Sequence, residues 1–567
     1  MTDKKTKYIL AIDLGTSGPK STIISTNGEV VDSEFMDVPL YLFPGGGAEQ
    51  DPGDWWNAIM TTSKKVLAKN LVRASDIVAV SCTSQWSGTV AVDEHGNHLM
   101  NAIIWYDTRG AKYMKELTKG IINVEGFGLL KAIRWVWLTG AVPSPSGKDP
   151  FCHILYLKNE KPDVYRQAYK FLEPKDYLNL RFTGKFCASY DSIAMHWVTN
   201  NRDINNVFYG KKLIKWSTID PDKLPELKKA IEICGPIKPE IADELGLSRD
   251  VVVGMGCPDL HSAALGSGAV RDYEGHIYIG TSSWLLCHVP FKKTDIFHNI
   301  ASLPSSLPGR YLLANEQESA GKCLMFLRDN MFFPKDQVSQ EHAPAGVYDR
   351  FNAAVAEVPP GSNKVIFTPW LYGERSPIEN DTVRGGFLNV SLDTTRASLI
   401  RAVYEGVALN NRWLLGCVEG FIKRPMPYLN FIGGGANSDV WSQILADVLG
   451  RKIRQVKDPI TANARGAAFL AAISLGYITV YGSAVSLRQM KSSMSKYGKE
   501  SASATIFPRV VFPEPAEPKM MIPFGTIASF PWLRHSPYAG RGCSSLPASA
   551  AQVCRLPLRR LSVWMVL

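Results

Sequence analysis

The sequence predicts an α/β protein built from two similar halves, and three observations support this fold class. Apolar runs such as Tyr8-Ile-Leu-Ala-Ile-Asp13 end in turns rich in glycine, serine and threonine, which is typical of buried strands. The strand and turn at residues 8–18 are echoed at residues 277–284, and Gly15 and Gly280 lie 265 positions apart. Near the N-terminus the order is strand, hairpin, helix, strand. We therefore expect a duplicated fold in which each half brings one turn to a shared cleft, the arrangement of a bilobed nucleotide site.

Local signals predict the elements of the first half. Asn27-Gly28 lies between two short apolar runs and predicts a hairpin. Asp51 and Pro52 predict the start of an amphipathic helix that ends near residue 69. Residues 77–81 predict another buried strand. We expect residues 203–247 to be a charged, largely helical segment that closes this half.

The second half is expected to begin with the apolar strand at residues 251–257, which leads to Asp259. The small residues that follow, 260–268, predict a helix packed closely against a neighbour. Residues 431–439 predict a strand, a triple-glycine turn and a helix start. The predicted domains are therefore residues 7–250 and 251–490, followed by an atypical tail at residues 520–567.

Length and composition indicate an ordinary globular protein of several domains. The chain has 567 residues, of which 45% are hydrophobic and 20% charged. Its ten cysteines are scattered and form no Cys-x-x-Cys pair, so neither a zinc site nor a dense disulfide framework is indicated. No secretory leader and no apolar run of the ~18 residues that a membrane span needs are found. We expect a cytoplasmic protein without a membrane partner.

The positive net charge does not indicate nucleic-acid binding. The net charge is +10 (63 − 53), and residues 520–567 contribute five arginines with no lysine or acidic residue. The remaining excess of about +5 is not clustered, so we expect no nucleic-acid partner, although a mild positive bias suits an anionic substrate. Because the tail also lacks clean periodicity, we hypothesise that it is disordered, or frame-shifted and non-native.

The first turn has the residue types of a phosphate-binding site. Asp13, at the end of a strand, can hold Mg²⁺ directly or through water. Backbone N–H groups and hydroxyls of the next residues can point at a phosphate, because glycine lets the backbone approach closely. No Gly-Lys-Ser/Thr follows, so this is not a Walker A loop. A plain strand and hairpin turn is the alternative explanation. The residues concerned are Gly15, Thr16, Ser17 and Gly18.

Several motifs, taken in chain order, resemble those of the FGGY carbohydrate kinases, and most closely the xylulokinase type. The resemblance covers about residues 7–480. It implies two ribonuclease-H-like (actin-type ATPase) lobes with a nucleotide and sugar cleft between them. It also implies Mg²⁺-dependent transfer of the ATP γ-phosphate to a sugar hydroxyl, with a ketopentose such as D-xylulose as the expected acceptor. The motifs are at residues 13–18, 49–56, 84–88, 102–109, 256–259, 280–284, 369–377, 399–406 and 433–437.

The resemblance also assigns roles to residues of this chain. Asp259 becomes the general base that accepts the proton of the acceptor hydroxyl, while an Asp that only caps the next helix is the alternative. Asp13 becomes the Mg²⁺ ligand, and both turns contact the transferring phosphate. In the second turn these residues are Gly280, Thr281 and Ser282. The adenosine site is assigned to Gly433, Gly434, Gly435, Ala436 and Asn437, for which a tight strand–helix turn is the alternative.

Three residues are candidates for the sugar pocket: Gln85, Trp86 and Tyr156. Aromatic faces suit the C–H face of a sugar and amides suit its hydroxyls, although core packing explains each aromatic equally well. Asp107 and Arg109 are expected to form a structural ion pair below the pocket. His261 is expected to be a locally satisfied histidine and not a second base.

The sequence departs from the family mainly on the sugar side. Trp86-Ser87 stands where xylulokinases usually carry Met-His and glycerol kinases Arg-Glu, and Leu260 and Arg465 are also unusual. The alternatives are therefore a kinase for another polyol or sugar (glycerol, ribulose, erythritol-like), a catalytically silent sugar-binding paralogue, or an actin- or chaperone-like ATPase. The sequence leaves the oligomeric state open, with a homodimer as one alternative.

Overall fold

The structure of the chain is a computed structural model that describes residues 6–124, 127–478, 480–481, 484–485 and 500–501. All of these residues belong to one compact unit, Met1–Thr505. The predicted atypical tail at residues 520–567 lies outside the described residues. So do those residues of the predicted second domain, between 479 and 490, that are missing from these ranges.

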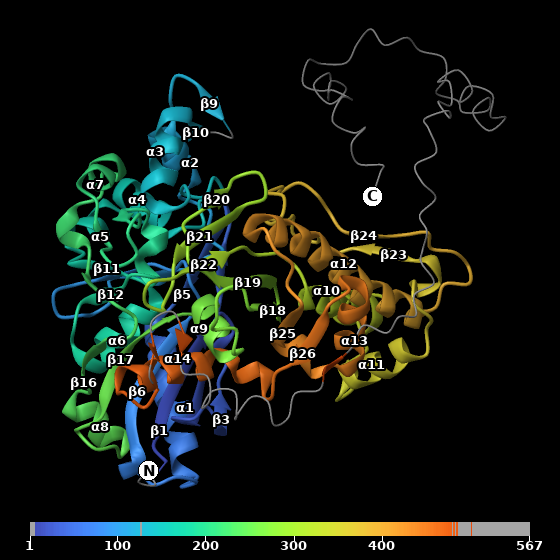
Figure 1. The fold of residues 1–567 in the computed structure, drawn as a ribbon, viewed down its shortest axis with the longest axis horizontal. Helices are drawn as coiled ribbons and strands as arrows, with labels where there is room; N and C mark the ends of the chain where they lie inside the picture. Colours follow the sequence, from blue (N-terminus) through green and yellow to red (C-terminus); the bar gives the residue numbers. More distant parts are fainter. Residues whose placement is uncertain (1–5, 125–126, 479, 482–483, 486–499, 502–567) are drawn as a thin grey trace. The chain divides into compact units, whose positions relative to one another are not determined.

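Six strands of the described chain form the first sheet, in the order β16-β17-β6-β1-β2-β3. The central strand β1 is antiparallel to β2 and parallel to β6, and β6 is parallel to β17. Figure 1 labels β1, β3, β6, β16 and β17. Their bounds are β1 (Tyr8–Gly15), β2 (Gly18–Ser25), β3 (Val30–Phe35), β6 (Ile77–Ser84), β16 (Ile233–Pro236) and β17 (Val252–Pro258).

The second sheet repeats the same pattern around β18. Its order in the described chain is β20-β21-β22-β19-β18-β25-β26-β29, with β18 antiparallel to β19 and parallel to β25. β18 and β19 thus occupy the positions of β1 and β2. The bounds are β18 (Gly275–Ile279), β19 (Ser283–Val289), β20 (Thr294–Asp295), β21 (Ile300–Pro304), β22 (Tyr311–Ala314), β25 (Tyr428–Ile432), β26 (Lys452–Gln455) and β29 (Glu500–Ser501).

The predicted duplication is therefore confirmed, because the two sheets share strand order and direction around β1 and β18. One strand lies elsewhere than expected. β17, which the sequence analysis placed at the start of the second lobe, is hydrogen-bonded to β6 and belongs to the first sheet. The apolar residues of β17 are buried in that sheet. The pairing with β6 therefore decides that β17 belongs to the first sheet. The predicted boundary at residues 250/251 thus lies before the last strand of the first sheet.

Helices cover the sheets and connect them. The predicted helix α1 (Pro52–Ala68) begins after Asp51, whose side chain accepts a hydrogen bond from the Gly53 N–H at 2.7 Å. Residues 203–247 are not largely helical, because two short helices alternate there with short strands. Further helices are α2 (Ala111–Thr118), α3 (Leu129–Thr139), α4 (Pro150–Glu160), α5 (Pro162–Gln167), α6 (Pro174–Thr183), α7 (Lys211–Ser217), α8 (Pro239–Leu245), α10 (Gly321–Phe326) and α11 (Val347–Ala356).

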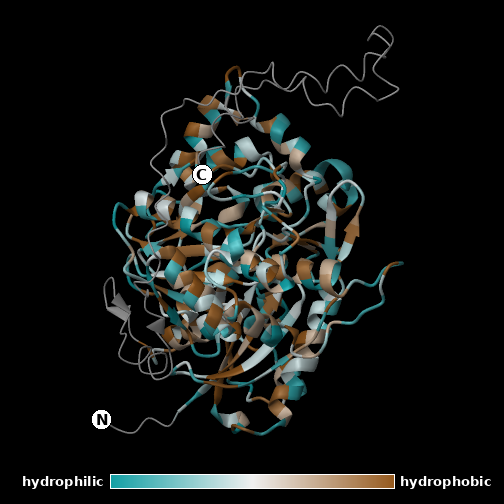
Figure 2. Ribbon diagram, turned by 90° about the vertical axis from the view of Figure 1, so that its right-hand side faces the viewer, coloured by the Kyte–Doolittle hydropathy of each residue, from teal (hydrophilic) through white to brown (hydrophobic). Residues whose placement is uncertain are grey.

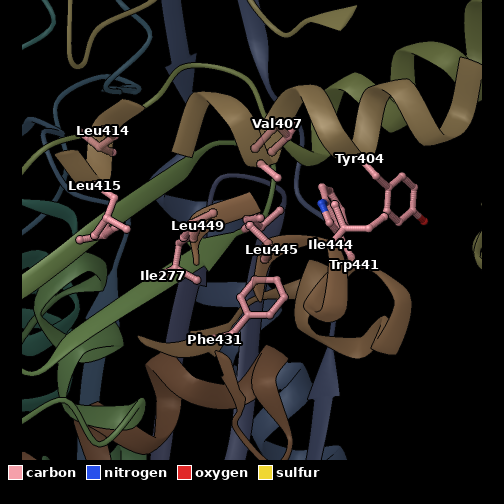
Figure 3. Packing of buried hydrophobic residues seen from close by; sticks show 14 of the residues in the cluster. Ile277, Tyr404, Val407, Leu414, Leu415, Phe431, Trp441, Ile444, Leu445 and Leu449 are labelled. Carbon is pink, nitrogen blue, oxygen red and sulfur yellow. The ribbon is translucent and has the colours of Figure 1, made fainter. Parts of the chain in front are cut away.

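Most helices carry hydrophobic residues on one side and polar residues on the other (Figure 2), as surface helices over a core do. In the second half, α12 (Arg396–Ile422) and α13 (Asp439–Leu449) pack together over the sheet. Figure 3 shows Tyr404 of α12 facing Trp441 of α13, with ring centroids 4.5 Å apart. Ile277 and Phe431 of the sheet lie below them, fully buried. This cluster supports the hairpin between β18 and β19.

Two helices carry the chain between the sheets and contact each other very closely. α9 (Asp259–Gly266) leads from β17 of the first sheet towards β18 of the second, and α14 (Ala462–Ser474) follows β26 of the second sheet and packs on β1 and β6 of the first. A Cβ atom on Gly266 would lie 1.7 Å from the Ala462 carbonyl oxygen, and one on Gly466 would lie 1.9 Å from the Ser262 carbonyl oxygen. Only glycine fits at these two positions.

No helix within the described ranges is long and apolar enough to cross a lipid bilayer.

We predict that Gly466→Ala lowers the free energy of unfolding by roughly 3 kcal/mol, because the methyl group would collide with the backbone of α9. The measurement is the thermal unfolding temperature, which should fall. Gly416→Ala is the matched control, since Gly416 lies in the middle of α12 with no atom within 4 Å of its Cβ position. That change should instead stabilise by about 0.5–1 kcal/mol. Equal effects of the two substitutions would contradict the close α9–α14 contact.

Candidate active site

The first turn, Gly15 to Gly18, is a tight hairpin held by its surroundings. A Cβ atom on Gly18, where φ is 148°, would lie 2.0 Å from the Met36 carbonyl oxygen, so only glycine fits. The Thr16 hydroxyl donates to Gln85 Oε1 at 2.9 Å and accepts from Trp105 Nε1 at 3.0 Å. Ser17 is exposed at the tip. The hydroxyl of Thr16 is therefore engaged within the protein, whereas that of Ser17 faces solvent.

The second turn, Gly280 to Ser282, closes the equivalent hairpin between β18 and β19. The Gly280 N–H donates to the Ser282 carbonyl oxygen at 3.0 Å, and Thr281 is exposed. The Thr281 carbonyl oxygen accepts hydrogen bonds from the N–H groups of Ala320 (3.0 Å) and Lys322 (3.2 Å). The start of α10 is thus attached directly to this turn.

The triple-glycine turn lies against the same hairpin. Gly433, with φ of 86°, follows β25, and a Cβ atom there would lie 2.5 Å from the Ile279 carbonyl oxygen. The turn from Gly434 to Asn437 leads into α13, with Gly434 and Asn437 exposed and Gly435 and Ala436 buried. The structure thus places this turn beside Gly280. Its assignment to adenosine stays a prediction.

Three buried carboxyl groups interact near the two turns: Asp13 of β1, Asp259, and Glu316, whose side chain hydrogen-bonds to Ser282. Burial raises the pKa of Asp259 well above its ordinary value, and the nearby charges of Asp13 and Glu316 raise it further. Burial also raises the pKa of Asp13, which Lys20 and a hydrogen bond from Asn463 of α14 oppose. Asp13 belongs to the first sheet and Glu316 follows β22 of the second, so both halves of the fold contribute to this cluster.

Asp259 is the first residue of α9 and accepts a hydrogen bond from the N–H of Leu260 at 2.8 Å. The cap and the base, considered as alternatives for this residue, are therefore compatible. No lysine or arginine of the described chain forms an ion pair with Asp259, and a carboxyl whose pKa is raised by burial and by nearby like charges is a candidate catalytic group.

An arginine bridge sits beside the carboxyl cluster. Arg375 donates to Glu316 Oε2 at 2.5 Å and to Glu318 Oε1 at 2.7 and 3.0 Å. Lys148, which precedes α4 of the first half, donates to the same Glu318 oxygen at 3.1 Å. Although burial opposes it, these two cations hold the pKa of Glu318 at about 2. The two cations and the two glutamates therefore balance in charge.

The candidate sugar residues are engaged with the protein. Gln85 donates to Gln50 Oε1 at 2.8 Å and accepts from Thr16, and Trp86 donates to the Ser192 carbonyl oxygen at 2.9 Å. The Tyr156 hydroxyl accepts from Arg109 at 3.1 Å, with the guanidinium 4.4 Å from the ring centroid. Their polar groups thus have partners, and sugar contact by these residues stays a prediction.

The predicted Asp107–Arg109 ion pair is confirmed, whereas the prediction that His261 is locally satisfied holds for one ring nitrogen only, because its buried Nδ1 has no hydrogen-bond partner. Arg109 forms an ion pair with Asp107, at 2.8 Å from its Nε, and with Glu49 at 2.6 Å. His261 lies close to the Pro304 carbonyl oxygen, at 3.0 Å from its Nε2, and packs edge-on against Trp86. Burial lowers the pKa of His261 to about 4, so it is neutral and unsuited to act as a second base.

The sequence analysis proposed no functional role for several residues near the two turns and the carboxyl cluster. Ser87 has φ of 67°, and its buried hydroxyl has no hydrogen-bond partner. Trp105 stacks on Tyr106 with centroids 3.9 Å apart. Both lie in motifs that the family resemblance includes, but composition and spacing say nothing about which side chains face a cleft. The remaining groups are Lys148, Glu316, Glu318, Lys322 and Arg375.

These features define the class of protein: a duplicated α/β fold in which two equivalent hairpins and a carboxyl cluster contributed by both halves form one site. Two family models match the chain, the N-terminal domain of the FGGY family of carbohydrate kinases at residues 8–266 and the C-terminal domain at residues 275–475. The chain belongs to the FGGY family of carbohydrate kinases.

Characterised relatives include kinases for different acceptors. The chain is 28% identical to a xylulose kinase of Staphylococcus epidermidis over 84% of this chain and 90% of the relative. It is 26% identical to a gluconokinase of Bacillus subtilis over 83% of this chain and 88% of the relative. A gluconate kinase structure from Lactobacillus acidophilus aligns with a TM-score of 0.73 at 25% identity, covering 88% of this chain and 94% of that one.

We predict that Asp259→Asn increases the free energy of unfolding near neutral pH by about 1 kcal/mol, because it removes a charge that burial disfavours. The unfolding temperature should rise accordingly. A carboxyl whose folded pKa lies above the ordinary 3.8 weakens the fold as pH rises from that value. The gain should therefore grow between pH 4.5 and 8 in thermal unfolding. A gain that shrinks with rising pH would contradict the raised pKa.

Proposed function

We propose that the protein transfers the γ-phosphate of ATP to a hydroxyl of an uncharged sugar, with a ketopentose such as D-xylulose as the leading acceptor. The observation that carries the proposal is the interaction of the buried Asp259 carboxyl with Asp13, which lies in β1 before the first turn, and with Glu316, which hydrogen-bonds to Ser282 of the second turn. In-line transfer needs a base for the hydroxyl and dense hydrogen-bond donors for the phosphate.

In this proposal Asp259 takes the proton as the acceptor oxygen forms its bond to the γ-phosphorus. The bond between that phosphorus and the β–γ bridging oxygen breaks, and ADP leaves. The exposed Ser17 and Thr281, with the backbone N–H groups of both turns, would hold phosphate oxygens. Gly433 to Asn437 would contact adenosine.

Mg²⁺ fits this site through Asp13. Among the described residues no group of three or more His, Cys, Asp or Glu side chains is arranged to hold a metal. Mg²⁺ in kinases commonly needs only one or two carboxylates together with substrate phosphates. Burial raises the pKa of both Asp13 and Asp259, the charge of Asp13 raises that of Asp259 further, and a bound Mg²⁺ would supply positive charge that favours both carboxylates.

The acceptor is proposed to be uncharged because two cations beside the carboxyl cluster, Arg375 and Lys148, are already paired. They are bound by Glu316 and Glu318, so neither is available to a substrate carboxylate. The xylulose kinase relatives support a ketopentose. The gluconokinase relatives make a sugar acid the second candidate. The unpartnered hydroxyl of Ser87 is available to an acceptor hydroxyl.

We predict that Asp259→Ala reduces kcat by at least about 10²–10⁴-fold, the contribution of a general base, while ATP still binds. ADP release is measured across pentuloses, polyols, hexoses and sugar acids, and ATP binding by calorimetry. Retained turnover in Asp259→Ala would refute the assignment of the base. Preference for gluconate over every neutral acceptor in the wild type would refute the proposed acceptor class.

We also predict that Glu316→Gln moves the acidic limb of the kcat/KM pH profile to lower pH. The glutamate charge helps to raise the pKa of Asp259, and its removal also leaves Arg375 less neutralised. Both effects favour the ionised base. The change is measured with the preferred acceptor over pH 5 to 8. An unchanged or upward-shifted limb would show that Asp259 and Glu316 are not coupled.

A further inference from the structure

Lys322, the second residue of α10, carries a cation that is not committed to a carboxylate. Its ammonium lies over the rings of Tyr106 and Tyr372, 5.4 and 5.6 Å from their centroids. In the described part of the chain no Asp or Glu forms an ion pair with it. Aromatic faces hold an ammonium weakly and leave its N–H groups able to donate to an anion.

The other cations near the carboxyl cluster differ from Lys322. Arg375 and Lys148 are paired with Glu316 and Glu318. Lys20 donates to the Ile460 carbonyl oxygen at 2.8 Å, and its charge acts on Asp13. Lys322 therefore has the charge most available to a bound anion among these four residues.

Lys322 is connected to both hairpin turns. Its own backbone N–H donates to the Thr281 carbonyl oxygen at 3.2 Å, which fixes it on the second turn. Its ring partner Tyr106 stacks on Trp105, whose indole N–H donates to the Thr16 hydroxyl of the first turn at 3.0 Å. Lys322 is thus fixed to the second turn by its backbone, and its ammonium is linked to the first turn through Tyr106 and Trp105, which places its charge near the region where a phosphate held by both turns would lie.

We infer that Lys322 binds the terminal phosphate of the nucleotide and neutralises it during transfer. The inference rests on the proposed function, because it assumes that the two turns hold a nucleoside triphosphate. Lys322 forms no covalent bond and keeps its protons; it donates hydrogen bonds to phosphate oxygens as the phosphoryl group moves from ADP to the acceptor. It is a phosphate ligand, distinct from the base Asp259.

The test compares a nucleotide that has a third phosphate with one that lacks it. The full chain and the variants Lys322→Met, Lys322→Gln and Lys322→Arg are titrated by calorimetry with AMP-PNP and with ADP in the presence of Mg²⁺. We expect Met and Gln to weaken AMP-PNP binding roughly tenfold to hundredfold, the range of a charge-assisted hydrogen bond, and ADP binding less than twofold. Arg should retain most of the affinity. In turnover, kcat should fall while KM for the acceptor stays unchanged.

Lys211→Met is the matched control, because Lys211 is an exposed lysine of α7 and the substitution makes the same change of charge. It should bind both nucleotides like the wild type. Equal weakening of AMP-PNP and ADP in the Lys322 variants, no weakening, or a change confined to the KM of the acceptor would each overturn the inference. A wild type that binds AMP-PNP but phosphorylates no sugar would refute the proposed function alone. A wild type that binds neither nucleotide would refute both.

Discussion

The crossing of α9 and α14 is the contact on which the site depends. Gly266 and Gly466 let the two helices approach until each backbone fills the space a side chain would need. α9 begins with Asp259, and α14 carries Asn463, which hydrogen-bonds to Asp13. The same two segments carry the chain between the sheets. Because this crossing fixes both Asp259, the proposed base, and Asn463, the partner of Asp13, its geometry determines how these two aspartates are held relative to each other.

The carboxyl cluster that results is unfavourable for the folded chain alone. Asp13, Asp259 and Glu316 are desolvated, and the charges of Asp13 and Glu316 add to burial in raising the pKa of Asp259. Arg375 pairs with Glu316, and Arg375 together with Lys148 compensates Glu318. Asp259 differs from both glutamates, because no lysine or arginine of the described chain forms an ion pair with it. A buried carboxyl without a cation is an arrangement that proteins tolerate at functional sites.

The sequence predicted the repeated part of the fold well because strand and turn signals are local. The echo of residues 8–18 at 277–284 predicted the duplication, and Asp51 predicted the start of α1. Two predictions were wrong for reasons that are not local. β17 belongs to the first sheet because it pairs with β6, and residues 203–247 form short mixed elements instead of long helices. The arginine bridge was missed because Arg375 and Glu316 lie far apart in sequence and meet only in the fold.

Phosphate and acceptor recognition differ in how much the sequence alone can tell. The turns proposed to hold the nucleotide depend on glycines whose backbone contacts exclude any side chain, as Gly18 and Gly433 show, so a short motif carries most of the information. The acceptor side depends on which side chains have unfulfilled hydrogen bonds. Gln85 and Trp86 are prominent in the sequence yet use their polar groups internally, while the unremarkable Ser87 keeps a buried hydroxyl without a partner. Under the proposed function, the acceptor is recognised by groups that can be identified only once the surrounding hydrogen bonds are known.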